Sequence, residues 1–161
     1  MREPYLPVAG DTMTILFVGL FRLNGALLAA GDRLVGNLGL TSARWQVIGV
    51  VANSSVPLPV ASIARNMGLT RQGVRVVVND LAATGLVRFV PNPHHRKAHL
   101  VMLTPEGESV HRAAKERWLP WTNQLGRGLS RERIEDAVEL LQMILLRLEE
   151  NSPGTAESHI D

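Results

Sequence analysis

The chain has 161 residues, of which 45% are hydrophobic, so it is long enough to form one domain with a sizeable core. It contains no cysteine, which excludes disulfide bonds, cysteine-ligated metals and thiol redox chemistry. The apolar run from Met13 to Phe21 is too short to span a bilayer, and it follows Asp11, where a signal peptide would carry positive charge. We therefore expect a soluble, cytoplasmic protein.

The net charge is only +2, but the charges are unevenly distributed. Six basic residues and one acid lie between Ala61 and Leu100, whereas eight acids and two arginines lie between Glu132 and the end of the chain. The middle of the chain is therefore suited to a polyanion and the C-terminal part is not. Solvated helix faces without any partner would carry similar charges, so that alternative stays open.

The N-terminal part predicts a flexible arm followed by a long helix. Residues 1–11 carry Pro4, Pro7 and Gly10 without periodicity, which is typical of an extended segment. Asp11 or Thr12 can cap a helix that runs to about Val35, and its apolar residues lie around more than one face. Such a helix must be buried on several sides, which indicates a subunit interface as well as an internal core.

Two shorter helices are predicted next. The first begins at Thr41 or Ser42, and its inward stripe consists of Trp45, Ile48 and Val51 or Ala52. The second covers residues 60–67 after a proline pair and ends in a turn at Gly68. Because another helix follows at once, this pair is typical of a helix-turn-helix.

The helix after the turn should begin at Thr70, whose hydroxyl can accept a backbone hydrogen bond, and end at Gly85, which tolerates a left-handed backbone. One face is apolar and should be buried, because hydrophobic residues recur at spacings of three and four: Val74, Val77, Val78 and Leu81. A different face is polar and offers hydrogen-bond donors to base edges and phosphates: Arg71, Gln72, Arg75 and Asn79.

A basic hairpin follows this helix. Residues 86–90 and 100–103 read as two strands, and the polar, proline-bounded loop PNPHHRKAH joins them. We call the two strands and this loop the wing. The predicted fold class is mainly α-helical with a small β-hairpin wing: a winged helix-turn-helix flanked by N- and C-terminal helices.

The C-terminal part predicts two more helices and a tail. Thr104 can cap a helix that runs from Pro105 to about Gln124, with a kink at Pro120. Ser130 can cap the last helix, and residues 151–161 read as a disordered acidic tail. The last helix carries an apolar stripe that only the first helix or a partner chain could cover: Ile134, Val138, Leu141, Leu145 and Leu148.

From Thr12 to Glu150 the order of elements resembles the MarR family of bacterial winged helix-turn-helix transcription regulators. The segments that carry the resemblance are PVASIARNMGLTRQGVRVVVNDLAATGLVRF, the wing, and LVMLTPEG before the long helix. The resemblance implies a homodimer formed by residues 12–40 and 105–150, and a DNA-binding lobe formed by residues 41–104. It also implies a palindromic operator, repression of genes, and release from DNA when a small, often aromatic or phenolic, ligand binds between the dimerisation helices and the DNA-binding lobe.

The wing departs from the family pattern, which usually carries an Asp-x-Arg pair whose arginine enters the minor groove. The matching positions here are His95 and Lys97, with Arg96 between them. The acid is absent, and lysine lacks the planar fork of arginine. Either Lys97 or Arg96 is therefore expected to take the minor-groove role.

The expected DNA contacts come from two elements. The first is the helix between Thr70 and Gly85, which we call the recognition helix. Its residues Arg71, Gln72 and Arg75 are placed to reach base edges, while Thr70 and Asn79 are better suited to phosphates. In the wing, the expected contacts are His94, His95, Arg96 and Lys97. An alternative is that Arg75 pairs with an acid of the protein itself, such as Asp80.

The remaining candidate sites are weaker. His94, His95 and His99 lack a nearby carboxylate or cysteine, so we expect no metal and no cofactor. Trp45, Trp118 and Trp121 could line a ligand pocket, or could be core and interface residues. No catalytic triad or phosphate-binding loop is visible, so we do not expect an enzyme. The alternative function is a winged helix that binds proteins and not DNA.

Overall fold

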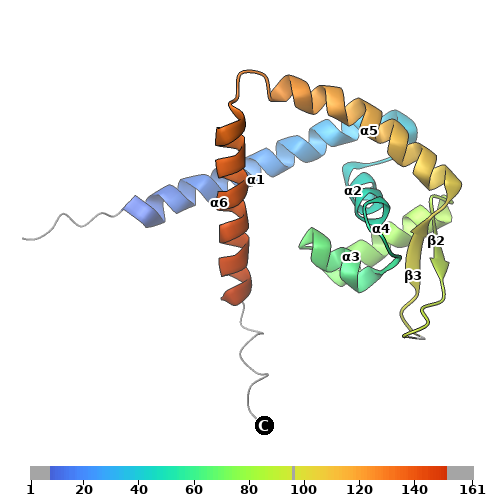
Figure 1. Ribbon diagram of the computed structural model, residues 1–161. Helices are drawn as coiled ribbons and strands as arrows, with labels where there is room; N and C mark the ends of the chain where they lie inside the picture. The colour runs from blue at the N-terminus through green and yellow to red at the C-terminus, as the bar shows by residue number, and fades with distance from the viewer. Residues whose placement is uncertain (1–7, 96, 152–161) are drawn as a thin grey trace, which may run out of the picture. The chain divides into compact units, whose positions relative to one another are not determined.

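The computed structural model describes residues 8–95 and 97–151, and these form a mainly helical fold with one small sheet, as the sequence predicts. Figure 1 shows helices α2, α3 and α4 gathered beside the β2–β3 hairpin. In chain order the elements are α1 Val8–Val35, the 3-10 helix η1 Gly36–Leu38, α2 Ser42–Ala52, β1 Leu58–Pro59, α3 Val60–Met67, α4 Arg71–Ala83, β2 Val87–Val90, β3 Leu100–Leu103, α5 Pro105–Leu125 and α6 Arg131–Glu150.

Short polar side chains start four of these helices; at α5, Thr104 Oγ1 accepts a hydrogen bond from the amide of Gly107 (3.1 Å). Thr41 Oγ1 accepts a hydrogen bond from the amide of Arg44 (3.3 Å), and Ser130 Oγ accepts one from the amide of Arg133 (3.3 Å). Thr70 Oγ1 accepts one from the amide of Gly73 (3.1 Å). Each bond satisfies one of the free amides at a helix N-terminus, so the predicted starts of α2, α4, α5 and α6 are confirmed.

The first helix begins earlier than expected. α1 starts at Val8, so residues 8–11 are helical and do not belong to a flexible arm. Neither Asp11 nor Thr12 is its first residue, because Gly10 inside a first turn weakens a helix without breaking it. Residues 1–7 of the predicted arm and residues 152–161 of the predicted tail lie outside the described part of the chain.

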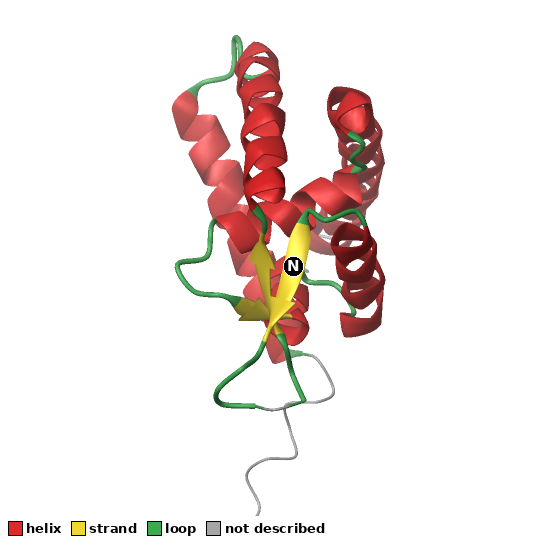
Figure 2. Ribbon diagram, turned by 90° about the vertical axis from the view of Figure 1, so that its right-hand side faces the viewer, coloured by secondary structure: helices red, strands yellow, loops and turns green. Residues whose placement is uncertain are grey.

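The sheet has a third strand that the sequence did not predict. β1 pairs antiparallel with β3 through Leu58 opposite Val101 and Pro59 opposite Leu100, which gives the order β1-β3-β2. A two-residue strand that ends in proline has no periodicity and one amide fewer to donate, so its sequence carries no strand signal. Figure 2 shows the loop between β2 and β3 projecting from one end of this sheet.

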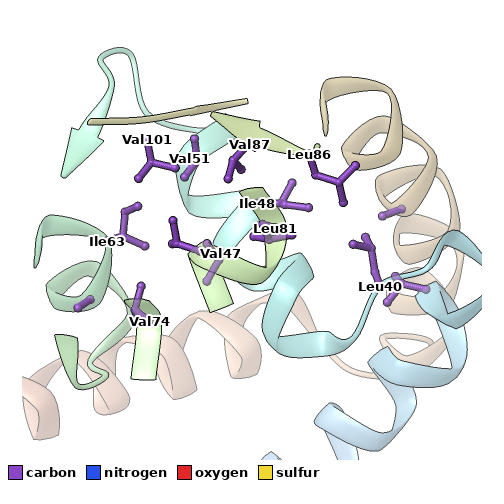
Figure 3. Close-up of a cluster of buried hydrophobic side chains, with 14 residues drawn as sticks. Leu40, Val47, Ile48, Val51, Ile63, Val74, Leu81, Leu86, Val87 and Val101 are labelled. Atoms are coloured by element: carbon purple, nitrogen blue, oxygen red, sulfur yellow. The ribbon is translucent and has the colours of Figure 1, made fainter. Parts of the chain in front are cut away.

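The core is built around α2, which packs against α1, α3, α4 and β3. Figure 3 shows Val47, Ile48 and Val51 of α2 among buried side chains of the neighbouring helices and strands. Trp45, predicted on the inward stripe, is only half-buried, while Val47 is fully buried although it lies off that stripe. A helix surrounded on several sides has no single inward stripe, which is why the pattern mislocated this contact.

Hydrogen bonds fix the elements that border α2. Asp32 Oδ1 accepts a bond from the amide of Ser42 (2.6 Å), and the hydroxyl of Ser42 donates to the carbonyl oxygen of Leu28 (2.6 Å). A Cβ at Gly31 would overlap the Ser42 hydroxyl, so the two helices meet where one has no side chain. The guanidinium of Arg117 donates to the carbonyl oxygen of Leu34 (3.2 Å), which attaches α5 to the end of α1.

The chain divides into two compact units, residues 1–120 and residues 121–161. The boundary falls directly after Pro120, inside α5. Proline has no amide hydrogen to donate and its ring crowds the carbonyl one turn earlier, so this is the weakest point of the helix.

The apolar segment near the N-terminus is longer than the run of residues 13–21 that the sequence analysis considered. Residues 10–38 are long and apolar enough, by length and composition alone, to cross a membrane. The prediction that this segment is too short to span a bilayer is therefore corrected. The exposed large side chains include Phe21, of which 77% is accessible in the single chain. An exposed apolar surface of this extent commonly marks an interaction site.

Candidate nucleic-acid interface

Helix α4 presents the predicted polar residues to solvent. Its opposite face is anchored by Val74, Val78 and Leu81, which are fully buried. As a consequence the predicted readout residues are all exposed: Thr70, Arg71, Gln72, Arg75 and Asn79. The Thr70 oxygen accepts the capping bond from Gly73, and its hydroxyl hydrogen remains available to a phosphate oxygen.

A cationic groove separates α4 from the wing. Its volume is about 290 Å³, and it is bordered on the helix side by Arg71, Arg75 and Asn79. Phe89, Lys97 and His99 border it on the wing side. Residues from two elements thus direct positive charge and hydrogen-bond donors into one concave surface, which favours an anionic polymer.

The only carboxylate of α4, that of Asp80, forms an ion pair with an arginine of α2. Arg44 of α2 approaches Asp80 with 3.7 Å between Nη2 and Oδ2, and its other terminal nitrogen donates to the carbonyl oxygen of Gly39 (3.4 Å). The alternative in which Asp80 pairs with Arg75 is therefore wrong. Within the described residues no acid forms an ion pair with Arg75, so its charge stays available to a partner.

The wing loop is organised by Asn92. Its side-chain oxygen accepts a hydrogen bond from the amide of His94 (3.0 Å), and its carbonyl oxygen accepts one from the amide of His95 (3.3 Å). His94, His95 and Lys97 are exposed. Arg96 lies outside the described residues, so the choice between Arg96 and Lys97 for the minor groove stays a prediction.

His99 differs from the other two histidines of the wing. Its ring lies edge-to-face with Phe89 at a centroid distance of 6.4 Å, beside the cationic groove. No group of three side chains suited to hold a metal ion occurs among the described residues.

A second cavity, of about 420 Å³, lies between α1, α2 and α5. Trp45 and Trp118 line it, with their rings edge-to-face and a centroid distance of 4.8 Å. Trp121, which we grouped with them, belongs to the second compact unit and is not part of this lining. The other walls are supplied by Asn24, Leu27, Leu28, Gly31, Ser42, Gln46, Gly49, Asn53, His111 and Lys115.

His111 and Lys115 form a polar end of this cavity that the sequence reading missed. The Nδ1 atom of His111 is buried and has no hydrogen-bond partner in the part of the chain that the structure describes. Burial, reinforced by the positive charge of Lys115, lowers the pKa of His111 below the usual histidine value. The spacing of His111, Lys115 and Trp118 by four and three residues could have shown that they share one face of α5.

Comparison with known proteins decides the family. The MarR family model matches residues 38–98, which contain α2, the helix-turn-helix and most of the wing. An uncharacterised protein of Mycobacterium tuberculosis is 34% identical over 143 residues, covering 89% of this chain and 99% of that protein. The chain belongs to the MarR family. Its members are DNA-binding transcription regulators and not enzymes.

Two further similar proteins are informative. The transcriptional activatory protein BadR of Rhodopseudomonas palustris is 30% identical over 97 residues, covering 59% of this chain and 55% of BadR. The crystal structure of CouR from Rhodococcus jostii, bound to p-coumaroyl-CoA, superposes with a TM-score of 0.71 at 22% identity, covering 88% of this chain and 95% of that one. The second comparison supports the fold alone.

Replacement of His111 by glutamine should change the pH dependence of stability. Because the pKa of His111 is lowered in the folded chain, the unfolded chain binds a proton that the folded chain does not between that pKa and about pH 6.5. The free energy of unfolding of the wild type therefore falls as the pH falls through this window. We expect a smaller fall for H111Q, measured by thermal denaturation at about pH 8 and about pH 5. Equal pH dependence in both proteins would contradict this assignment.

Proposed function

We propose that the protein is a cytoplasmic, homodimeric and sequence-specific repressor that binds a palindromic operator and is released by a small aromatic ligand. The observation that carries the proposal is the cationic groove, in which Arg71 and Arg75 of α4 lie opposite Lys97 of the wing. A B-DNA major groove about 12 Å wide admits an α-helix, and its flanking phosphates are then within reach of a wing.

The roles follow from position and chemistry. Arg71, Gln72 and Arg75 occupy the first two turns of α4, where an inserted helix meets base edges. Thr70 and Asn79 suit phosphate oxygens, and Lys97 suits the minor groove beside the wing. Asp80 is the single acid of α4, and its pairing with Arg44 leaves the exposed face of the helix without a free carboxylate, which favours an anionic partner.

The DNA-binding role predicts a strong dependence on the two arginines. DNA fragments selected by the purified protein should contain a palindrome, and R71A or R75A should each weaken binding to it about tenfold or more if the side chain reads a base. An arginine that only contacts phosphate should instead lower the slope of log affinity against log salt by about one. Fluorescence anisotropy over a salt series measures both effects.

A matched control is Arg131→Ala, because the guanidinium of Arg131 bonds Glu135 of its own helix (2.6 Å). This variant should bind the selected DNA like the wild type. If no sequence is enriched and the salt response is flat, the protein is a winged-helix interaction module and the DNA-binding proposal fails.

Homodimerisation explains the uncovered apolar surfaces of α1 and α6. In the single chain Leu145 and Leu148 of α6 are 60% and 57% exposed, and the rest of the predicted stripe is exposed or half-buried. The stripe repeats at spacings of four and three residues, which is the pattern that packs one helix against another. A second copy of the chain would cover these residues and would present two α4 helices to successive half-sites.

Two charges in the stripe should separate the protomers. We expect Leu145→Glu combined with Leu148→Glu to give a monomer, because a dimer would bury both carboxylates without partners. Sedimentation equilibrium measures the mass, and operator binding should weaken with it, since two half-sites are no longer bound as one unit. Gln142→Glu adds a charge at an exposed polar position of the same helix and serves as the control. A monomeric wild type would contradict the proposal.

The cavity between α1, α2 and α5 is the proposed effector site. Its tryptophan pair suits a flat aromatic ring, while Lys115 and the unpartnered His111 Nδ1 suit an anionic or hydrogen-bonding substituent. CouR is a protein of the same fold bound to an aromatic acyl thioester. α2 couples this cavity to the DNA surface, because Trp45 lines the cavity and the adjacent Arg44 holds Asp80 of α4.

Benzoate and its neutral counterpart benzamide should distinguish the contribution of the tryptophan pair from that of the polar end at Lys115 and His111. Isothermal titration calorimetry should show that Lys115→Met weakens benzoate binding by roughly fivefold, a modest value because Lys115 is exposed, and leaves benzamide binding unchanged. Lys115→Arg keeps the charge and should retain most of the affinity. Equal losses for both compounds would show that Lys115 does not select an anion.

A further inference from the structure

Val76 is the one large apolar side chain on the exposed face of α4. It is 53% exposed, whereas Val74 and Val78 of the same helix are fully buried and Val77 is half-buried. A β-branched residue is a poor helix former at an exposed position, so local helix stability does not account for a valine here.

The position of Val76 on the helix separates it from the residues that border the cationic groove. At 100° per residue, Arg71, Arg75 and Asn79 fall within an arc that borders the cationic groove. Gln72 and Val76, one turn apart, lie on the side of that arc away from the wing, and neither lines the groove.

The immediate surroundings of Val76 are unsuited to a phosphate. Gly73, one turn earlier, has no side chain, so DNA can approach the helix closely there. Asp80, one turn later, is the only charged side chain at helical contact spacing, and Arg44 pairs with it. If this side of α4 meets DNA, it meets base edges and not the anionic backbone.

We propose that Val76 contacts the C5-methyl group of a thymine in each half-site of the operator. The thymine methyl is the one apolar group that a base pair displays in the major groove, and a small branched side chain is its natural partner. Gln72, one turn earlier, can form paired hydrogen bonds with adenine N6 and N7. The two residues together select A·T pairs on the side of the readout away from the wing. This inference rests on the proposed DNA-binding function and adds a base preference to it.

Replacement of single thymines by 2′-deoxyuridine tests the contact, because it removes only the methyl group. In the selected operator each thymine of one half-site is replaced in turn, and the dissociation constant is measured by fluorescence anisotropy for the wild type, Val76→Ala and Val56→Ala. Val56 lies between α2 and β1 and is 60% exposed, so its truncation matches that of Val76 in size and exposure.

We expect one thymine whose replacement weakens binding of the wild type and of V56A about fourfold, the value for one methyl group withdrawn from water. The same replacement should leave V76A binding unchanged, since its methyl contact is already lost. The inference is overturned if the half-site lacks thymine, if no replacement matters, or if V76A responds as the wild type does. A failure to enrich any sequence would instead overturn the proposed DNA-binding function, and this inference with it.

Discussion

The contact between α2 and α4 is the constraint on which the rest of the fold depends. Val47 and Ile48 of α2 share one buried cluster with Val74 and Leu81 of α4, so the recognition helix is held by its apolar face and its polar face must point outward. Deletion of a single buried side chain of this kind typically costs about 2 to 5 kcal/mol, which is a large part of the stability of a small domain. The orientation of the residues proposed to contact DNA is thus set by hydrophobic packing and not by polar contacts.

An ion pair then determines the net charge on the exposed face of α4. α4 carries a single carboxylate, and its pairing with Arg44 at 3.7 Å is weak in energy because both side chains are partly exposed. The pair matters for the electrostatic potential of the helix surface, because the arginine offsets the one negative charge that would repel a polyanion. Because Arg44 is adjacent to Trp45, the same turn of α2 borders both the DNA-facing helix and the tryptophan-lined cavity.

Local signals in the sequence predicted local features correctly. Thr70 and Gly85 mark the ends of α4 because capping and a positive φ depend on one residue and its near neighbours. Features that depend on distant segments were not predictable. β1 exists because β3 offers it a partner, and the polar end of the cavity requires α5 to pack beside α2, which places His111 and Lys115 near Trp45. Composition and periodicity carry no information on such pairings.

Pro120 has a mechanical consequence. Trp118 and the polar end of the cavity lie before it in α5, and all of α6 lies after it. Bending a helix at a position that already lacks one backbone hydrogen bond costs less than bending it elsewhere, so α5 is compliant at this residue and stiff on either side. α1 and the DNA-binding lobe lie together on one side of this residue, where Ser42 bonds Asp32 and Leu28. In the proposed dimer, α6 could therefore change its angle at Pro120 without disturbing α1, the lobe or the tryptophan-lined cavity.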